Sequence, residues 1–167
     1  SVTSSNWNSA QTVTVTGADD NLVDGTQNST TSITVVDVIS DDSFDSVADQ
    51  TVSVTTTDND VAGFTVTQSG GSTSVSETGT TDTFTVVLNA QPASDVVLSI
   101  SSSDTGEATV TSTLTFTAAN WNSAQTVTVT GVDDNIIDGT IASTITASII
   151  DAISDDDFDS VADQTVS

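Results

Sequence analysis

The sequence predicts an all-β protein built from antiparallel β-sandwich modules. About seven short segments in a little over 100 residues alternate Val, Ile, Leu or Phe with Thr and Ser, which is strand composition. Turn-forming residues separate these segments roughly every 8 to 15 residues, and no stretch has a convincing helical period. This combination is typical of an immunoglobulin-like β-sandwich.

An internal repeat sets the domain organisation. Residues 1–53 align with residues 115–167 without a gap at a constant offset of 114, and 36 of the 53 aligned positions are identical. A period this long is that of a whole domain rather than of a solenoid turn. We therefore interpret residues 1–57 as the second half (strands E to G) of one repeat, residues 58–60 as an interdomain joint, and residues 61–167 as a nearly complete second repeat.

The expected strands follow from the apolar alternation. Any helical turn is expected only within 41–49 or 155–163. Trp7 and Trp121 precede equivalent strands, where a lone Trp more often plugs the end of a sandwich core than stacks on a ligand. The expected strands are 1–3, 10–17, 29–36 and 51–57 in the first repeat, and 63–68 continued by 73–77, 83–88, 95–101, 108–111 with 114–117, 125–130, 143–150 and 164–167 in the second.

Composition excludes several classes of function. The chain has 24 Asp and Glu residues, no Lys, Arg or His, and a net charge of −24, so nothing can neutralise a phosphate backbone and nucleic acid is excluded as a partner. The same charge does not suit an anionic membrane surface, and no apolar run approaches the roughly 20 residues of a membrane span. Without His, Lys, Cys or Arg, only paired carboxylates remain for catalysis, so we expect no enzyme.

The acidic residues form short groups between strands, where no cation of the chain can pair with them. Each carboxylate must face water, accept a neutral hydrogen bond or bind a metal ion, so the groups are either a solvated acidic surface or cation sites. In an up-and-down succession of seven strands, alternate loops share one pole. That pole would gather Glu77, Asp104, Glu107, Asp133, Asp134 and Asp138 in the second repeat, and Asp19, Asp20 and Asp24 with the tail Asp58, Asn59 and Asp60 in the first.

Hard oxygen ligands suit Ca²⁺, and the chain has no His or Cys for zinc or copper. The loop 19–25 is not an EF-hand, because it lacks that motif's Gly at position six and Glu at position twelve. If the acidic groups are cation sites and not a solvated surface, the cofactor expected is Ca²⁺.

Five motifs in order carry a family resemblance. They are the start Ser76-Glu77-Thr78-Gly79, the turn 103–108 (SDTGEA), the strand 114–117 (LTFT), the Asp-Asp…Asp-Gly loop and the terminal Asp-Asn-Asp. The chain resembles the Calx-β domain, and more closely the Calx-β and cadherin-like tandem repeats of large bacterial surface proteins. The resemblance implies Ca²⁺ bound at one pole of each module. The implied ligands are Asp19, Asp20, Asp24, Asp58, Asn59 and Asp60 in the first repeat, and Glu77, Asp104, Asp133, Asp134 and Asp138 in the second.

Taken together, these features predict a structural or adhesive module of a long extracellular protein or fibre, stiffened by Ca²⁺ at its poles and joints. The alternative is a glycan- or protein-binding module of a surface adhesin, acting through the Trp loops or the Thr- and Ser-rich faces. We expect a secreted, cell-surface location, with neighbouring repeats of the same chain as partners and other copies of the chain as partners in a filament.

Overall fold

The computed structural model describes residues 1–137 and 139–167, and within them the fold is all-β with antiparallel sheets and no α-helix. No helix in the described part of the chain is long and apolar enough to cross a membrane. The strands are β1 (Gln27–Ile33), β2 (Gln50–Thr56), β3 (Phe64–Gln68), β4 (Thr81–Leu88), β5 (Val96–Ser102), β6 (Ala108–Val110), β7 (Thr113–Phe116), β8 (Gln125–Gly131), β9 (Ile145–Ile149) and β10 (Gln164–Val166).

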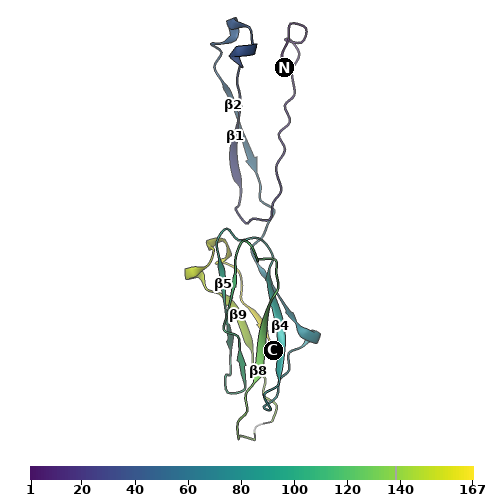
Figure 1. The fold of residues 1–167 in the computed structure, drawn as a ribbon, viewed down its shortest axis with the longest axis vertical. Coiled ribbons are helices and arrows are strands. Elements are labelled where there is room, and N and C mark those ends of the chain that lie inside the picture. The colour runs from purple at the N-terminus through teal and green to yellow at the C-terminus, as the bar shows by residue number, and fades with distance from the viewer. Residues whose placement is uncertain (138) are drawn as a thin grey trace.

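Two four-stranded sheets pack face to face in the lower part of Figure 1. One has the strand order β3-β4-β8-β6 and the other has the order β10-β9-β5-β7. We call this unit, residues 61–167, the sandwich. Its core includes the fully buried side chains of Phe84, Leu98, Phe116, Val127 and Phe158. The predicted all-β class and sandwich-like packing are therefore confirmed.

Alternation along each strand produces the two faces of each sheet. In β8, Val127 and Val129 are buried while the intervening threonines stay partly exposed. Successive side chains of a strand point to opposite faces, so this heptapeptide sends its valines inward and its hydroxyls outward. Gly131 ends the strand where a Cβ atom would lie 2.2 Å from the backbone oxygen of Ser76, so only glycine fits this close approach.

Residues 1–57, which we call the half-module, lie end to end with the sandwich along the long axis of the molecule (Figure 1). Its β1 and β2 form a separate two-stranded sheet in which Thr31 is opposite Val52. The equivalent residues of the sandwich, Ile145 and Val166, are paired in the same way between β9 and β10. The hairpin therefore keeps the repeat's own register without the rest of the fold.

Three predicted strands are wrong. Residues 1–3 and 10–17 have no strand structure, although 11–17 and β8 are identical in sequence. In the sandwich β8 pairs with β4 and β6, and the half-module has no counterparts of these two strands. Residues 73–77 are also not a strand: a 3-10 turn at Ser69–Gly71 ends β3, and the Asp82 carboxylate accepts the Ser74 N–H at 2.9 Å.

Short 3-10 turns lie between the last two strands of each repeat. Those at Asp42–Phe44 and Asp156–Phe158 fall inside the two windows where a helical turn was expected. Two more, at Asp37–Ile39 and Asp151–Ile153, come just before these windows, and the turn at Ser69–Gly71 lies far from them, so the expectation that helical turns are limited to the windows is wrong. Because the turns recur at equivalent positions in both repeats, they are encoded locally.

Candidate metal centre

The half-module meets the sandwich through its loop 19–25. The backbone N–H of Gln91 donates to the backbone oxygen of Asn21 at 2.7 Å, and the backbone N–H of Val23 donates to the backbone oxygen of Gln91 at 3.1 Å. Leu22 forms an isolated bridge with Gln91, and Val23 packs against the sandwich core. These contacts and residues 58–60 form what we call the joint. Its direct backbone contact holds the two units in a defined relation.

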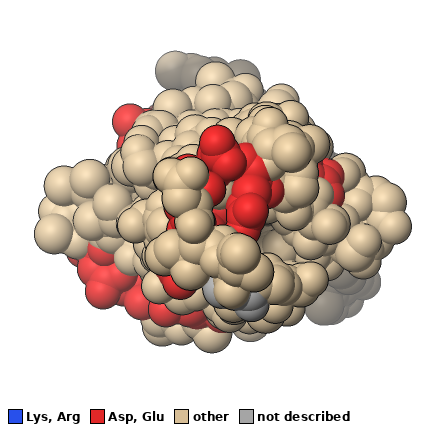
Figure 2. Space-filling view, turned by 90° about the horizontal axis from the view of Figure 1, so that it is seen from below, with Lys and Arg blue, Asp and Glu red and all other residues tan. Residues whose placement is uncertain are grey.

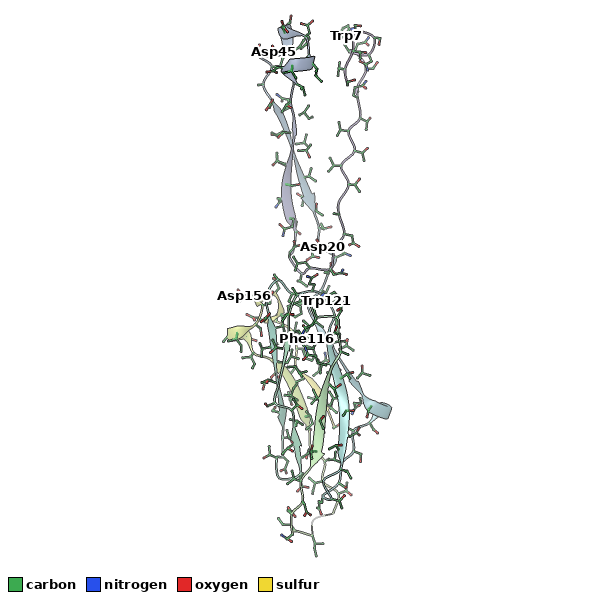
Figure 3. The ribbon with its side chains drawn as sticks, in the orientation of Figure 1. Trp7, Asp20, Asp45, Phe116, Trp121 and Asp156 are labelled. Atoms are coloured by element: carbon green, nitrogen blue, oxygen red, sulfur yellow. The ribbon has the colours of Figure 1, made fainter. Side chains whose placement is uncertain are left out.

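The acidic residues of the joint surround one small cavity of about 220 Å³. They reach it from the loop 19–25 and from the segment that follows β2; Figure 3 labels Asp20 at this place. Five of the six predicted ligands of the first repeat therefore line one cavity. The five are Asp20, Asp24, Asp58, Asn59 and Asp60.

Asp58 organises this site through backbone hydrogen bonds. Its Oδ1 accepts the N–H of Asp60 at 2.7 Å, and its Oδ2 accepts the N–H groups of Gly25 at 2.8 Å and Asp24 at 3.1 Å. These bonds favour the ionised form, so the hydrogen bonds from Asp60 and Gly25 hold the pKa of Asp58 below its ordinary value. The charge of Asp58 thereby ties the loop to the joint.

Asp60 shows the opposite electrostatic effect. Loss of hydration raises its pKa first, and repulsion from Asp58, Asp19, Asp20 and Asp24 raises it further. The carboxylate of Asp19, which is not among the residues lining the cavity, is therefore close enough to act through its charge. Asp60 is therefore repelled by the other four aspartates of this region, and the chain supplies no Lys, Arg or His to offset their charge.

The predicted ligands of the second repeat are less gathered. Glu77 lines a cavity of about 710 Å³ at the lower end of the sandwich, together with Ile136, Ile137 and Glu107, which was expected at this pole but not as a ligand. Seen from this end, Figure 2 shows Asp and Glu side chains and no Lys or Arg. Asp104 and Asp134 each accept a backbone N–H within their own turn, from Gly106 at 3.0 Å and Ile136 at 2.6 Å. Asp133 is exposed, and Asp138 lies outside the described residues.

The donor set of the joint suits a hard cation, since it consists of carboxylate, amide and carbonyl oxygens. As the side chains stand, no group of three or more Asp or Glu residues in the described ranges is arranged to hold a metal ion. At Asp58 both oxygens already accept backbone N–H groups, so an ion would share them. The chemistry of the residues fits Ca²⁺, and binding would require the carboxylates to turn toward one another.

Sequence reasoning missed two residues of structural importance. Gln91 meets the loop 19–25 through its backbone N–H and C=O, while its side-chain amide donates to the Ala118 oxygen at 3.4 Å, so its residue type gave no signal of the joint. Asp155, which is only 5% exposed, accepts from the Ser94 N–H at 2.7 Å and from the Asp157 N–H at 3.2 Å. It thereby fastens the loop before β10 to the turn between β4 and β5. Its signal was present: an Asp placed to cap the Asp156–Phe158 turn.

The two tryptophans have different surroundings. Trp121 packs against the sandwich core, and its backbone oxygen accepts the Leu88 N–H at 3.1 Å. Trp7 lies at the far end of the half-module (Figure 3) and is 73% exposed. For Trp121 the core interpretation is therefore confirmed, whereas for Trp7 it is wrong, because this side chain is largely exposed.

No family model matches the chain, and a search of curated proteins found no match. The resemblance to Calx-β repeats accordingly stays a prediction based on motifs.

Proposed function

We propose that the chain is a structural repeat module of a long extracellular protein or fibre, with Ca²⁺ bound at the joints between modules. The observation that carries this proposal is the joint. There the backbone of Asn21 and Val23 pairs with Gln91, and carboxylates from both sides of the hairpin surround one cavity. A module that keeps a fixed relation to its neighbour is what a rod requires.

The strand order supports a finer assignment of the fold. With β3, β4 and β5 as strands A, B and C, and β8, β9 and β10 as strands E, F and G, one sheet contains A, B and E and the other contains G, F and C. The strand between C and E is divided, because β6 pairs with β8 while β7 pairs with β5. This distribution is that of immunoglobulin-like sandwiches, so we assign the repeat to a Calx-β-like version of that fold.

The residues proposed to hold the ion are Asp20, Asp24, Asp58 and Asp60, with Asp19 and Asn59 completing the shell. A bound Ca²⁺ supplies the positive charge that the chain lacks. Loss of hydration is the first cause of the raised pKa of Asp60, and repulsion from the neighbouring aspartates, which this charge would offset, is the second. The carboxylates come from the loop 19–25, which precedes β1, and from the segment that follows β2. An ion there would therefore also cross-link the start of β1 to the end of β2, just above the sandwich.

The proposal is tested by adding and removing Ca²⁺ from the full chain. Extracellular sites with dissociation constants of about 10⁻⁴ to 10⁻³ M, in Ca²⁺ near ten times that value, contribute roughly 1.4 kcal/mol each. We expect Ca²⁺ to raise the melting temperature and to narrow the range of molecular lengths seen by X-ray scattering. If EGTA changes neither the melting temperature nor the maximum dimension, the calcium proposal fails.

A pair of variants places the effect at the joint. Asp24→Asn removes one proposed ligand charge and should abolish most of the response to Ca²⁺. Asp45→Asn removes the same charge at the far end of the hairpin, which Figure 3 shows well away from the joint, and should leave the response unchanged. Equal losses in the two variants would indicate a general effect of net charge and not a site.

A further inference from the structure

Within the described part of the chain, two backbone hydrogen bonds join the half-module to the sandwich, and both involve Gln91. Its N–H donates to the Asn21 oxygen, and its C=O accepts from the Val23 N–H. Leu22, which lies between these two residues, forms the isolated parallel bridge with Gln91. Hydrogen bonds that water can reach contribute little net free energy, because water offers the same groups equivalent partners. Holding the two units in one position therefore requires more than these two bonds.

An apolar side chain supplies a further contact at the same place. Val23 is partly buried and packs against the hydrophobic core of the sandwich, although it belongs to the other unit. On the receiving side, Ala90 and Pro92 flank Gln91 and are both buried, so the turn is anchored on either side of the residue that meets the loop. An apolar side chain packed beside a hydrogen bond lowers the local dielectric constant and strengthens the bond.

The local structure of the loop points this residue away from its own repeat. The Asp20 carboxylate accepts the Leu22 N–H at 3.0 Å, and a bond of the same kind closes the turn at residues 134–136 of the second repeat. At the position of Val23 the second repeat has Ile137, which is 102% exposed and so does not enter the core of its own sandwich. A residue presented in this way is available for contact with a neighbouring unit.

The proposed calcium ligands do not reach the sandwich. Among the described residues, all those that line the joint cavity lie within 18–60 and none lies within 61–167. Asp58 accepts its three backbone hydrogen bonds from residues of the same range. An ion in this cavity would thus close the base of the β1–β2 hairpin, and it would leave the contact between the two units to the loop and Gln91.

We propose that Val23 is the positioning residue of the joint. It docks the half-module on the sandwich as an apolar plug beside Gln91, and this docking needs no bound ion. The inference rests on the rod function proposed above and divides the work within the joint. Packing of Val23 fixes the relation between the two units, and Ca²⁺ acts on the base of the hairpin.

Two amides report on the docking. The N–H of Gln91 has its acceptor, Asn21, in the half-module, and the N–H of Val23 has its acceptor in the sandwich. The N–H of Asn89 donates to the Gly63 oxygen within the sandwich, so it reports on unfolding of that unit. Hydrogen exchange of these amides, followed by NMR on the full chain in EGTA, therefore separates undocking from unfolding.

Three variants test the role of the side chain. Val23→Asp places a charge against the sandwich core, so the Gln91 amide should exchange on the order of 10-fold faster or more, with the Asn89 amide unchanged. The range of molecular lengths in X-ray scattering should widen at the same time. Val38→Asp is the matched control: Val38 is 91% exposed in the same unit, so neither measurement should change. Val23→Ile, which introduces the residue type of position 137, should keep the Gln91 amide protected.

Three results would overturn the inference. The first is a Gln91 amide that stays as protected in Val23→Asp as in the unmodified chain. The second is loss of this protection from the unmodified chain in EGTA, since an ion would then hold the units together. The third is an equal loss in Val38→Asp, which would indicate a general effect of charge. Failure of the calcium proposal is distinguishable, because EGTA would then change neither melting temperature nor maximum dimension while Val23→Asp still undocks the half-module.

Discussion

The two equivalent phenylalanines allow a direct measurement of what core burial contributes. Phe158 follows Asp157 in the second 3-10 turn before β10 and is fully buried in the sandwich, whereas Phe44 occupies the same turn of the half-module and is largely exposed. The surrounding sequences are nearly the same. Substitution of each by Ala therefore changes the same local structure in two environments.

The expected magnitudes differ widely. Removing a fully buried Phe costs about 3 to 5 kcal/mol, and removing an exposed one costs below about 0.5 kcal/mol. A domain of about 100 residues unfolds with an entropy near 0.2 kcal/mol/K at its midpoint. Phe158→Ala should therefore lower the melting temperature of the sandwich by roughly 15 to 25 °C, and Phe44→Ala should lower it by less than about 3 °C.

Circular dichroism during heating measures both shifts, and exchange of the β5 and β8 amides confirms that the sandwich is the unit that melts. Phe158→Leu, which keeps most of the buried volume, should show a smaller loss than Phe158→Ala. Similar shifts for Phe44→Ala and Phe158→Ala would refute the reasoning, because they would mean that the turn itself and not its burial sets the stability.

Two further predictions concern the sheet end and the joint. Gly131→Ala places a Cβ atom 2.2 Å from the Ser76 oxygen and should destabilise the sandwich by about 1 to 3 kcal/mol in urea unfolding. Gly17→Ala, whose nearest neighbour is a methyl group at 3.5 Å, should be tolerated, and equal costs would contradict this account. Because hydrogen bonds lower the pKa of Asp58, its stabilisation is complete above the ordinary value of 3.8 and is lost as pH falls through the lowered value. The backbone amide of Gly25 should therefore be protected from hydrogen exchange at pH 5 and should lose this protection only in stronger acid. Loss of the protection already above pH 5 would show that another group holds the loop.

The limits of sequence reasoning are clearest in the repeated heptapeptide. Its Val and Thr alternation predicts a strand at both 11–17 and 125–131, and only the second is one. A strand is defined by hydrogen bonds to neighbours, so its local pattern states a preference and the available partners decide the outcome. The hairpin β1–β2 forms in the half-module because each of its strands carries its partner close by in the chain.

The sequence also predicted only part of the candidate site. Strand parity places the acidic loops at shared poles, and the joint residues Asp20, Asp24, Asp58 and Asp60 do meet. The pairing of the joint with Gln91 was not predicted, because a backbone contact leaves no mark on residue type. One signal was available: Leu22 and Val23 are apolar residues inside an acidic loop, and Val23 is the one that packs on the neighbouring core.

The contact at Gln91 joins two unlike surfaces, a loop of one unit and a turn of the next. Such a contact is heterologous, and where its rotation does not close a ring it gives an assembly two different ends. The lower end of the sandwich shows the loop surface again, with Ile136 and Ile137 exposed at the positions of Leu22 and Val23. An array built on this contact has a direction along its axis, and its length is set by the number of modules rather than by symmetry.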